Sequence, residues 1–169
     1  MENRKKQKEE KIKKLVNYIH QNQEKWYRLA YSYAKEQEMA LDIVQEAITK
    51  AISKIDTLKQ IEYMQTWFYR ILVNTAIDEI KKRKKQQELI PDDYSLDVTN
   101  EEWITGLELY QKVDTLPPKL KTIIILRFFE DKKLSEIAQI TNTNENTVKT
   151  RLYKALQKLK IQIQEEEYE

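Results

Sequence analysis

"LSEIAQITNTNENTVKTRLYKALQKL", residues 134–159, contains two apolar runs at helical spacing with a polar turn between them. Ser135 is expected to cap a short first helix, and Val148 is expected to begin a second, longer one. Asn142 and Asn146 stand where the turn requires left-handed backbone, which asparagine tolerates best after glycine. A short helix, a tight polar turn and a longer helix together predict a helix-turn-helix.

The second of these helices is predicted to have one apolar face and one basic face. At helical spacing, the apolar face consists of Val148, Leu152, Ala155, Leu156 and Leu159. The opposite face holds Thr147, Thr150, Arg151, Lys154 and Lys158. Basic runs usually lie on a solvated surface, but residues 146–160 contain no acid at all. Because a helix of this kind suits the major groove, DNA contact is predicted, with lysines on phosphates and Thr150 and Lys154 near base edges.

The composition of the chain favours an all-α protein without an active site. Its 169 residues include 30 bases and 28 acids, so the net charge of +2 predicts no partner by itself. One glycine and three prolines leave little turn chemistry for hairpins, and they exclude the glycine-rich loops that bind nucleotides. Without cysteine there is no thiolate metal site, and the single His20 is expected to be a surface residue. No catalytic residue, metal, cofactor or small-molecule substrate is therefore predicted.

Apolar periodicity and charge divide the chain into two small helical domains and a linker. Residues 1–85 contain three helical patterns after a basic N-terminal arm that carries seven bases and three acids in residues 1–14. Residues 86–103 contain six acids, no base and Pro91, which predicts an acidic linker. Helical patterns return over residues 104–169, where Pro118 suits a first helical turn. No run reaches the roughly 20 apolar residues of a membrane span, so a soluble, cytoplasmic protein is expected.

In this arrangement the chain resembles an extracytoplasmic-function (ECF) sigma factor of the sigma-70 family, over roughly residues 24–84 and 104–160. "YRLAYSYAKEQEMALDIVQEAITKA" (27–51) is similar to sigma regions 2.1–2.2, and "TWFYRILVNTAIDEIKK" (66–82) to regions 2.3–2.4. "LPPKLKTIIILRFFEDKKLSEIAQITNTNENTVKTRLYKAL" (116–156) is similar to region 4. The chain looks closest to the sigma-V-like group. The resemblance implies a non-catalytic subunit that directs core RNA polymerase to promoters.

For polymerase binding, the resemblance points to the "DIVQE" motif, which in the family docks on the β′ clamp helices. The residues it implies are Asp42, Ile43, Gln45 and Glu46. Asp42, Ile43, Glu46 and Lys50 are predicted to point away from the apolar stripe formed by Leu41, Val44, Ile48, Ala51, Ile52 and Ile55. Ile43 would then be an apolar anchor among polar contacts, although packing against the preceding helix is an even alternative.

For DNA, the resemblance implies one site for the −10 element and one for the −35 element. The loop "LKQIEYMQT" (58–66), with an exposed Tyr63 next to Trp67 and Asn74, would hold a flipped base of the opened −10 strand, and Asn74 matches a position that helps open the duplex in the family. Lys81, Lys82 and Arg83 would contact phosphates, although a basic helix end also suits the helix dipole. For the −35 duplex the resemblance implies Arg127, Lys149, Thr150, Tyr153 and Lys154, alongside Thr147 and Arg151 on the basic face.

The partners implied by the resemblance are the β′ and β subunits of core RNA polymerase, promoter DNA and a membrane-anchored anti-sigma factor. Two other functions fit parts of the sequence. A helix-turn-helix regulator that works without polymerase would need neither "DIVQEA" nor the aromatic loop. A helical interaction protein with basic faces would bind acidic partners without sequence preference.

Overall fold

The computed structural model describes residues 1–88 and 112–167, and side chains are described up to residue 86 and from 112 to 160. Every regular element within these ranges is helical, which confirms the predicted all-α class. The chain divides into two compact units, Met1–Ile80 and Lys81–Glu169, and each is described by itself below. Most of the predicted acidic linker, residues 89–103, lies outside the described residues.

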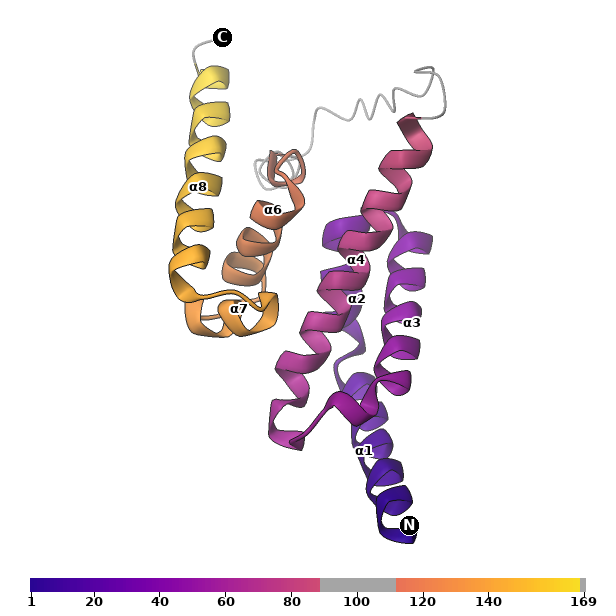
Figure 1. The fold of residues 1–169 in the computed structure, drawn as a ribbon. Helices are drawn as coiled ribbons and strands as arrows, with labels where there is room; N and C mark the ends of the chain where they lie inside the picture. Colours follow the sequence, from indigo (N-terminus) through magenta and orange to yellow (C-terminus); the bar gives the residue numbers. More distant parts are fainter. Residues whose placement is uncertain (89–111, 168–169) are drawn as a thin grey trace. The chain divides into compact units, whose positions relative to one another are not determined.

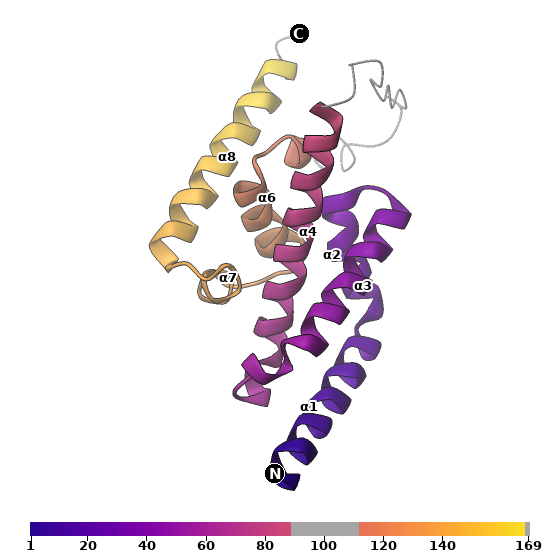
Figure 2. The same cartoon turned by 45° about the vertical axis from the view of Figure 1, so that its right-hand side comes forward.

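The first unit is built from three helices, the larger part of a fourth and two short 3-10 turns (Figure 1). Helices α1 (Glu2–Gln21) and α2 (Gln23–Ala34) follow each other almost without a break, and α3 (Gln37–Ser53) packs against α2. The turns η1 (Ile55–Thr57) and η2 (Ile61–Tyr63) then lead into the long helix α4 (Met64–Glu88). Figure 2 shows α3 and α4 alongside each other, with α2 close behind them.

The core of the first unit is centred on Trp26, which is completely buried. Its ring makes edge-to-face contacts with Tyr18 of α1 at 5.6 Å and with Phe68 and Tyr69 of α4 at 4.8 Å each. Such pairs contribute about 0.5–1.5 kcal/mol each beyond the burial of apolar area. Burial also raises the pKa of Tyr18 to about 12. One tryptophan on α2 therefore joins three helices.

Helix α3 has two apolar stripes, and the sequence-based choice of buried residues was right for Ala51 and, just after the helix, Ile55, but wrong for Leu41, Ile52 and Ile43. Ile43 is completely buried, together with Met39, Ala40, Ala47 and Ala51. Leu41 and Ile52, predicted to be core, are 45% and 39% exposed. Three alanines on the buried face let α2 approach α3 closely, and this close packing also encloses Met39 and Ile43.

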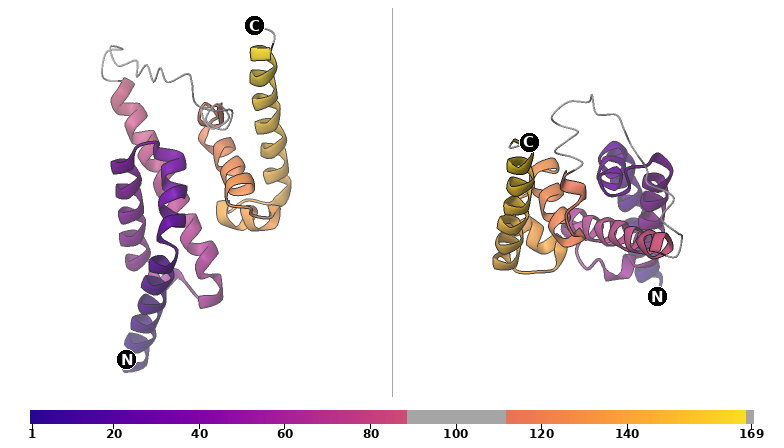
Figure 3. Two further views of the ribbon diagram at one scale, coloured as in Figure 1. Left: turned by 180° about the vertical axis from the view of Figure 1, so that it is seen from behind. Right: turned by 90° about the horizontal axis from the view of Figure 1, so that it is seen from above.

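The second unit contains the three helices that follow the proline pair. Helix α6 (Pro118–Ile124) begins with Pro118 at its first position, as predicted, and continues into η3, a π-helical turn over Ile125–Phe129. Helices α7 (Leu134–Thr141) and α8 (Glu145–Glu167) come next, and α8 packs against both α6 and α7. The two views of Figure 3 show α8 running along α6 within this unit.

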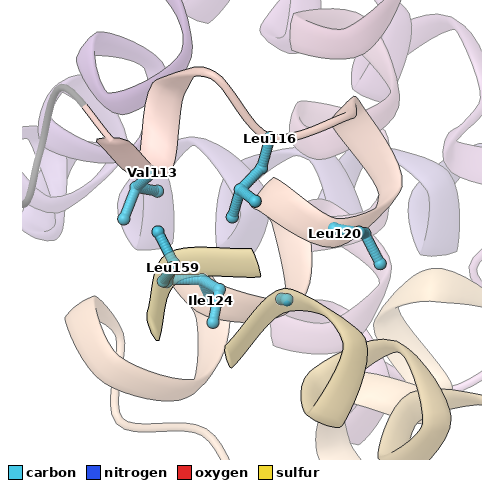
Figure 4. Packing of buried hydrophobic residues seen from close by; sticks show 6 residues of the cluster. Val113, Leu116, Leu120, Ile124 and Leu159 are labelled. Carbon is cyan, nitrogen blue, oxygen red and sulfur yellow. The ribbon is translucent and has the colours of Figure 1, made fainter. Parts of the chain in front are cut away.

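An aliphatic cluster holds α6 and α8 together (Figure 4). Its members are Val113, Leu116, Leu120, Ile124, Ala155 and Leu159, all at most 6% exposed. Beside this cluster the buried Lys121 places its Nζ 2.6 Å from Oδ1 of Asp114. Burial lowers the pKa of Lys121 to about 8. The cluster fixes how α8 sits on its unit, and hence which of its faces meets solvent.

Candidate nucleic-acid interface

The sequence predicts left-handed backbone at two asparagines of the turn between α7 and α8, and one of the two, Asn142, has it. Asn142 has φ 55° and ends α7, and the N–H of Thr143 donates to the Ala138 carbonyl at 2.9 Å. Asn146 was predicted to share this conformation, but it lies in the first turn of α8. Asparagine replaces the usual glycine here because its short polar side chain lowers the cost of left-handed backbone.

Both helices of the hairpin begin earlier than predicted, with different capping residues. Helix α7 begins at Leu134, so Ser135 is inside it; there Glu136 Oε1 accepts the N–H of Lys133 at 3.1 Å. Helix α8 begins at Glu145, one turn before Val148. Asn144 precedes it, and its Oδ1 accepts the N–H of Thr147 at 2.8 Å. Asn144 is thus the N-cap of α8, a role that was not predicted for it.

Replacing Asn144 with Ala is expected to destabilise the second unit by about 1 kcal/mol, because the Thr147 N–H loses its acceptor. Urea unfolding followed by circular dichroism measures this loss. Asn144→Asp is the matched control, since a carboxylate accepts the same hydrogen bond and also suits the positive end of the helix. Equal losses in both variants would contradict the capping role.

The basic face of α8 is exposed as predicted. Val148, Ala155 and Leu159 are buried, and this orients the opposite side outward. Lys149, Thr150, Tyr153, Lys154 and Lys158 are exposed, and Thr147 and Arg151 are half-buried. The hydroxyl of Thr150 donates to the Asn146 carbonyl at 2.9 Å, which leaves its oxygen as an acceptor and its methyl group for a base edge. Leu156, predicted to be core, is 38% exposed.

Arg127 stabilises a turn of the second unit in addition to being a candidate DNA-binding residue. It is half-buried in η3, and its Nη1 donates to the Lys132 carbonyl at 3.1 Å. This bond spans the junction that leads into α7, where Asp131 has φ 52°. The guanidinium therefore helps to shape the turn before the helix-turn-helix, and only its remaining N–H groups are left for phosphate.

In the first unit, the predicted base-binding residues lie around the η1–η2 segment at the start of α4. Tyr63 is 57% exposed, which confirms the predicted exposure. Trp67 is half-buried, and its Nε1 donates to Oγ1 of Thr57 at 3.0 Å. Asn74 is exposed two turns further along α4. Tyr63 thus offers a stacking surface, while Trp67 ties the segment to the helix.

Two lysines of α1, neither of which has a predicted role, also hold the same segment. Lys8 Nζ lies 3.4 Å from Oδ2 of Asp56, and Lys11 Nζ donates to the Leu58 carbonyl at 2.7 Å. Together with the Trp67 bond to Thr57, these contacts restrain three consecutive residues, 56–58. Because these lysines lie about 48 residues away along the chain, no local sequence pattern reveals the contacts.

The remaining predicted residues lie near the C-terminal end of α4 and on α3. Lys81 and Lys82 are exposed and Arg83 is half-buried near the end of α4. On α3, Asp42 and Gln45 are exposed, while Glu46 is half-buried and pairs with Lys50 at 3.7 Å. Leu41 lies beside them at 45% exposure, and Val44, Ile48 and Ile52 continue an outward apolar stripe. The contact set predicted around "DIVQE" therefore keeps its polar members but loses Ile43.

Residues 1–88 and 112–167 contain no group of three His, Cys, Asp or Glu side chains that could hold a metal ion. In those same ranges, no helix combines the length and the apolarity needed to cross a membrane.

Comparison with known proteins agrees with this arrangement. Residues 18–86 match the family described as Sigma-70 region 2, and residues 106–159 match Sigma-70, region 4. The chain is 49% identical to RNA polymerase sigma factor SigV of Bacillus subtilis, over 90% of this chain and 93% of SigV. It is 32% identical to the ECF sigma factor SigW of the same organism, over 84% of each chain.

A solved structure shows the same fold at low sequence identity. The sigma factor RpoE of Bartonella quintana, crystallised with the anti-sigma factor NepR, superposes with a TM-score of 0.69 at 18% identity. The match covers 90% of this chain and 98% of that one. The chain belongs to the sigma-70 family as an ECF sigma factor, a non-catalytic subunit that directs RNA polymerase to its promoters.

Proposed function

We propose that the outward face of α3 binds the β′ clamp helices of core polymerase. The face combines the exposed Leu41 with Asp42, Gln45 and Glu46, and the apolar stripe continues to Ile52. Apolar positions at intervals of three and four residues are what a helix presents to a partner helix. An apolar stripe bordered by polar residues is also a usual arrangement of an interface. Leu41 is therefore proposed as the apolar anchor of this interface, because Ile43 is buried and cannot contact a partner.

For promoter DNA, α8 is the element that reads the −35 duplex. The observation that carries this proposal is the orientation of α8: the burial of Val148, Ala155 and Leu159 turns outward the opposite face, which contains no acid over residues 146–160. On this face Thr150 and Lys154 are placed to meet base edges, and Lys149 and Tyr153 flank them. Thr147, Arg151 and Arg127 contribute to the same surface through atoms that are only partly exposed.

The segment around Tyr63 is proposed to hold a base of the opened −10 strand. Tyr63 offers an exposed ring for stacking, which contributes about 1–3 kcal/mol per base in single-strand sites. Trp67 and the α1 lysines keep the segment in place, and Asn74, Lys81, Lys82 and Arg83 follow along α4. Residues 1–85 thus serve polymerase and the −10 element, residues 104–169 serve the −35 element, and the acidic segment 86–103 is the tether.

A protein that masks these surfaces would regulate the factor. RpoE of B. quintana was crystallised with the anti-sigma factor NepR, and CnrH with the cytosolic domain of CnrY. CnrH superposes on this chain with a TM-score of 0.66 at 16% identity. By analogy, we expect a membrane-anchored anti-sigma factor to bind this chain as well, and the β subunit of polymerase to complete the assembly.

The test of −35 reading compares Lys154→Ala with Lys158→Ala in holoenzyme assembled from the full chain and core polymerase. Lys154→Ala should cost about 1–3 kcal/mol on the preferred −35 sequence and relax discrimination at one or two positions. Lys158→Ala is the matched control on the same face, one turn further from the tip. It should weaken binding to all sequences alike and lower the salt slope by at most about one. If Lys154→Ala also weakens every sequence equally, Lys154 reads no base.

A further inference from the structure

The charged residues of α1 are sorted onto two sides of the helix. Glu2, Glu9 and Glu10 fall on one side, together with Lys6 and Lys13. The opposite half of the helix carries no acid and holds Arg4, Lys5, Lys8, Lys11 and Lys14. Such segregation is not needed for solubility, because a mixed surface solvates equally well. It resembles the separation found on α8.

The acid-free side of α1 faces the η1–η2 segment. The contacts of Lys8 with Asp56 and of Lys11 with the Leu58 carbonyl come from two successive turns of α1. Further along the helix, the burial of Leu15 and Ile19 fixes the same side inward. The rotation of α1 about its axis is therefore determined, and its basic side lies next to the segment that presents Tyr63.

The basic side of α1 also continues beyond this segment. Arg4 lies one turn before Lys8 on the same side, about 6 Å further along the axis. Arg4, Lys5 and Lys14 are all exposed. Figures 1 and 2 show the N-terminal end of α1 projecting past the turns that follow α3. Arg4 and Lys5 are called the α1 strip below; Lys14 lies half a turn around the helix from Lys5 and is not part of it.

The η1–η2 segment needs positive charge from outside itself if it is to bind nucleic acid. Residues 55–67 contain one base, Lys59, against the two acids Asp56 and Glu62. Single-strand sites combine stacking surfaces with a positive track along the backbone, and here the segment supplies only the stacking surface. Lys8 offsets the charge of Asp56, and the α1 strip lies one turn further along the same side of α1.

We infer that the α1 strip binds the phosphodiester backbone of the opened promoter strand next to the base held at Tyr63. This inference rests on the proposed role of the Tyr63 segment in base capture. Arg4 and Lys5 contact phosphates beyond the segment. The contact carries no sequence information; it raises affinity for opened DNA and makes that affinity depend on salt.

The test measures binding of holoenzyme, assembled from the full chain and core polymerase, to a fluorescent DNA probe with an unpaired −10 bubble. Arg4→Gln/Lys5→Gln should lower the slope of log affinity against log salt by about 1.4, at about 0.7 per single-strand phosphate. The matched control, Lys6→Gln/Lys13→Gln, removes the same charge from the acid-bearing side of the same helix. Its slope should change by less than half as much. A fully duplex probe should show a smaller difference between the two variants than the bubble.

Three results would overturn the inference. Equal slopes for the two double variants would show a general electrostatic effect. An equal change on duplex and bubble probes would place the contact on duplex DNA, and a weaker affinity of Arg4→Gln/Lys5→Gln for core polymerase alone would make polymerase the partner. Tyr63→Ala tests separately whether the Tyr63 segment captures a base, which the inference assumes. If this variant retains the base preference at the bubble, base capture by the segment is wrong, whereas the slope difference still tests the α1 strip.

Discussion

Leu41→Asp is expected to lower the affinity of the chain for core polymerase by at least about 30-fold while leaving its melting temperature within about 2 °C of the wild type. Leu41 is 45% exposed, so a carboxylate there remains hydrated in the free chain. On binding, the same carboxylate would be buried in an apolar contact without a partner, which costs far more than the loss of the leucine. Fluorescence titration of labelled chain with core polymerase measures the change.

The matched control for Leu41→Asp is Val16→Asp on α1. Val16 is 50% exposed and belongs to none of the proposed surfaces, so its substitution should leave polymerase affinity unchanged. If both variants bind polymerase as tightly as the wild type, the outward stripe of α3 is not the docking surface. If both lose affinity together with stability, the effect belongs to folding and not to the interface.

Ile43→Asp is expected to unfold the first unit. Ile43 is completely buried between α3 and its neighbours, so the variant must bury an unpaired carboxylate or open the packing around it. Either course costs more than about 4 kcal/mol, which is a large share of the stability of a small domain. Thermal unfolding followed by circular dichroism should show the loss of this transition.

Ile43→Val provides the control, because it removes one methylene and should cost only about 0.5–1.5 kcal/mol. A stable Ile43→Asp variant that fails to bind polymerase would contradict the buried position of Ile43. It would restore the outward orientation that the sequence alone suggested. The two substitutions at neighbouring positions of α3, Leu41→Asp and Ile43→Asp, therefore separate the interface from the core.

The helices and the helix-turn-helix could be predicted from the sequence because their signals are local. Apolar periodicity, the scarcity of glycine and the proline pair at 117–118 are properties of short stretches, and the start of α6 at Pro118 followed from them. The basic face of α8 could also be predicted from helical spacing, because Val148, Ala155 and Leu159, which that spacing places on the opposite face, are buried. Tyr63 was placed correctly at the surface by the polar loop around it.

The sequence-based predictions failed for two reasons. Either two arrangements fit the same local pattern equally well, or the contact joins residues that are far apart in the sequence. On α3 both stripes have helical period, and only the packing of alanines against α2 decides that Ile43 is buried while Leu41 is exposed. In the turn, three asparagines alternate, and the hydrogen bond to Thr147 singles out Asn144 as the cap. The contacts of Lys8 and Lys11 bridge α1 and the 56–58 turn, so tertiary structure alone reveals them.

The most direct test of the account is run-off transcription by purified core polymerase from a library with randomised upstream and downstream promoter blocks. With the wild-type chain, transcripts should be enriched for one preferred sequence in each block, at a fixed spacing. With Lys154→Ala, the preference should relax at one or two positions of the upstream block and stay unchanged in the downstream block. Enrichment in a single block, or an equal loss of preference in both blocks with Lys154→Ala, would contradict the assignment of −35 reading to α8 and −10 reading to the first unit.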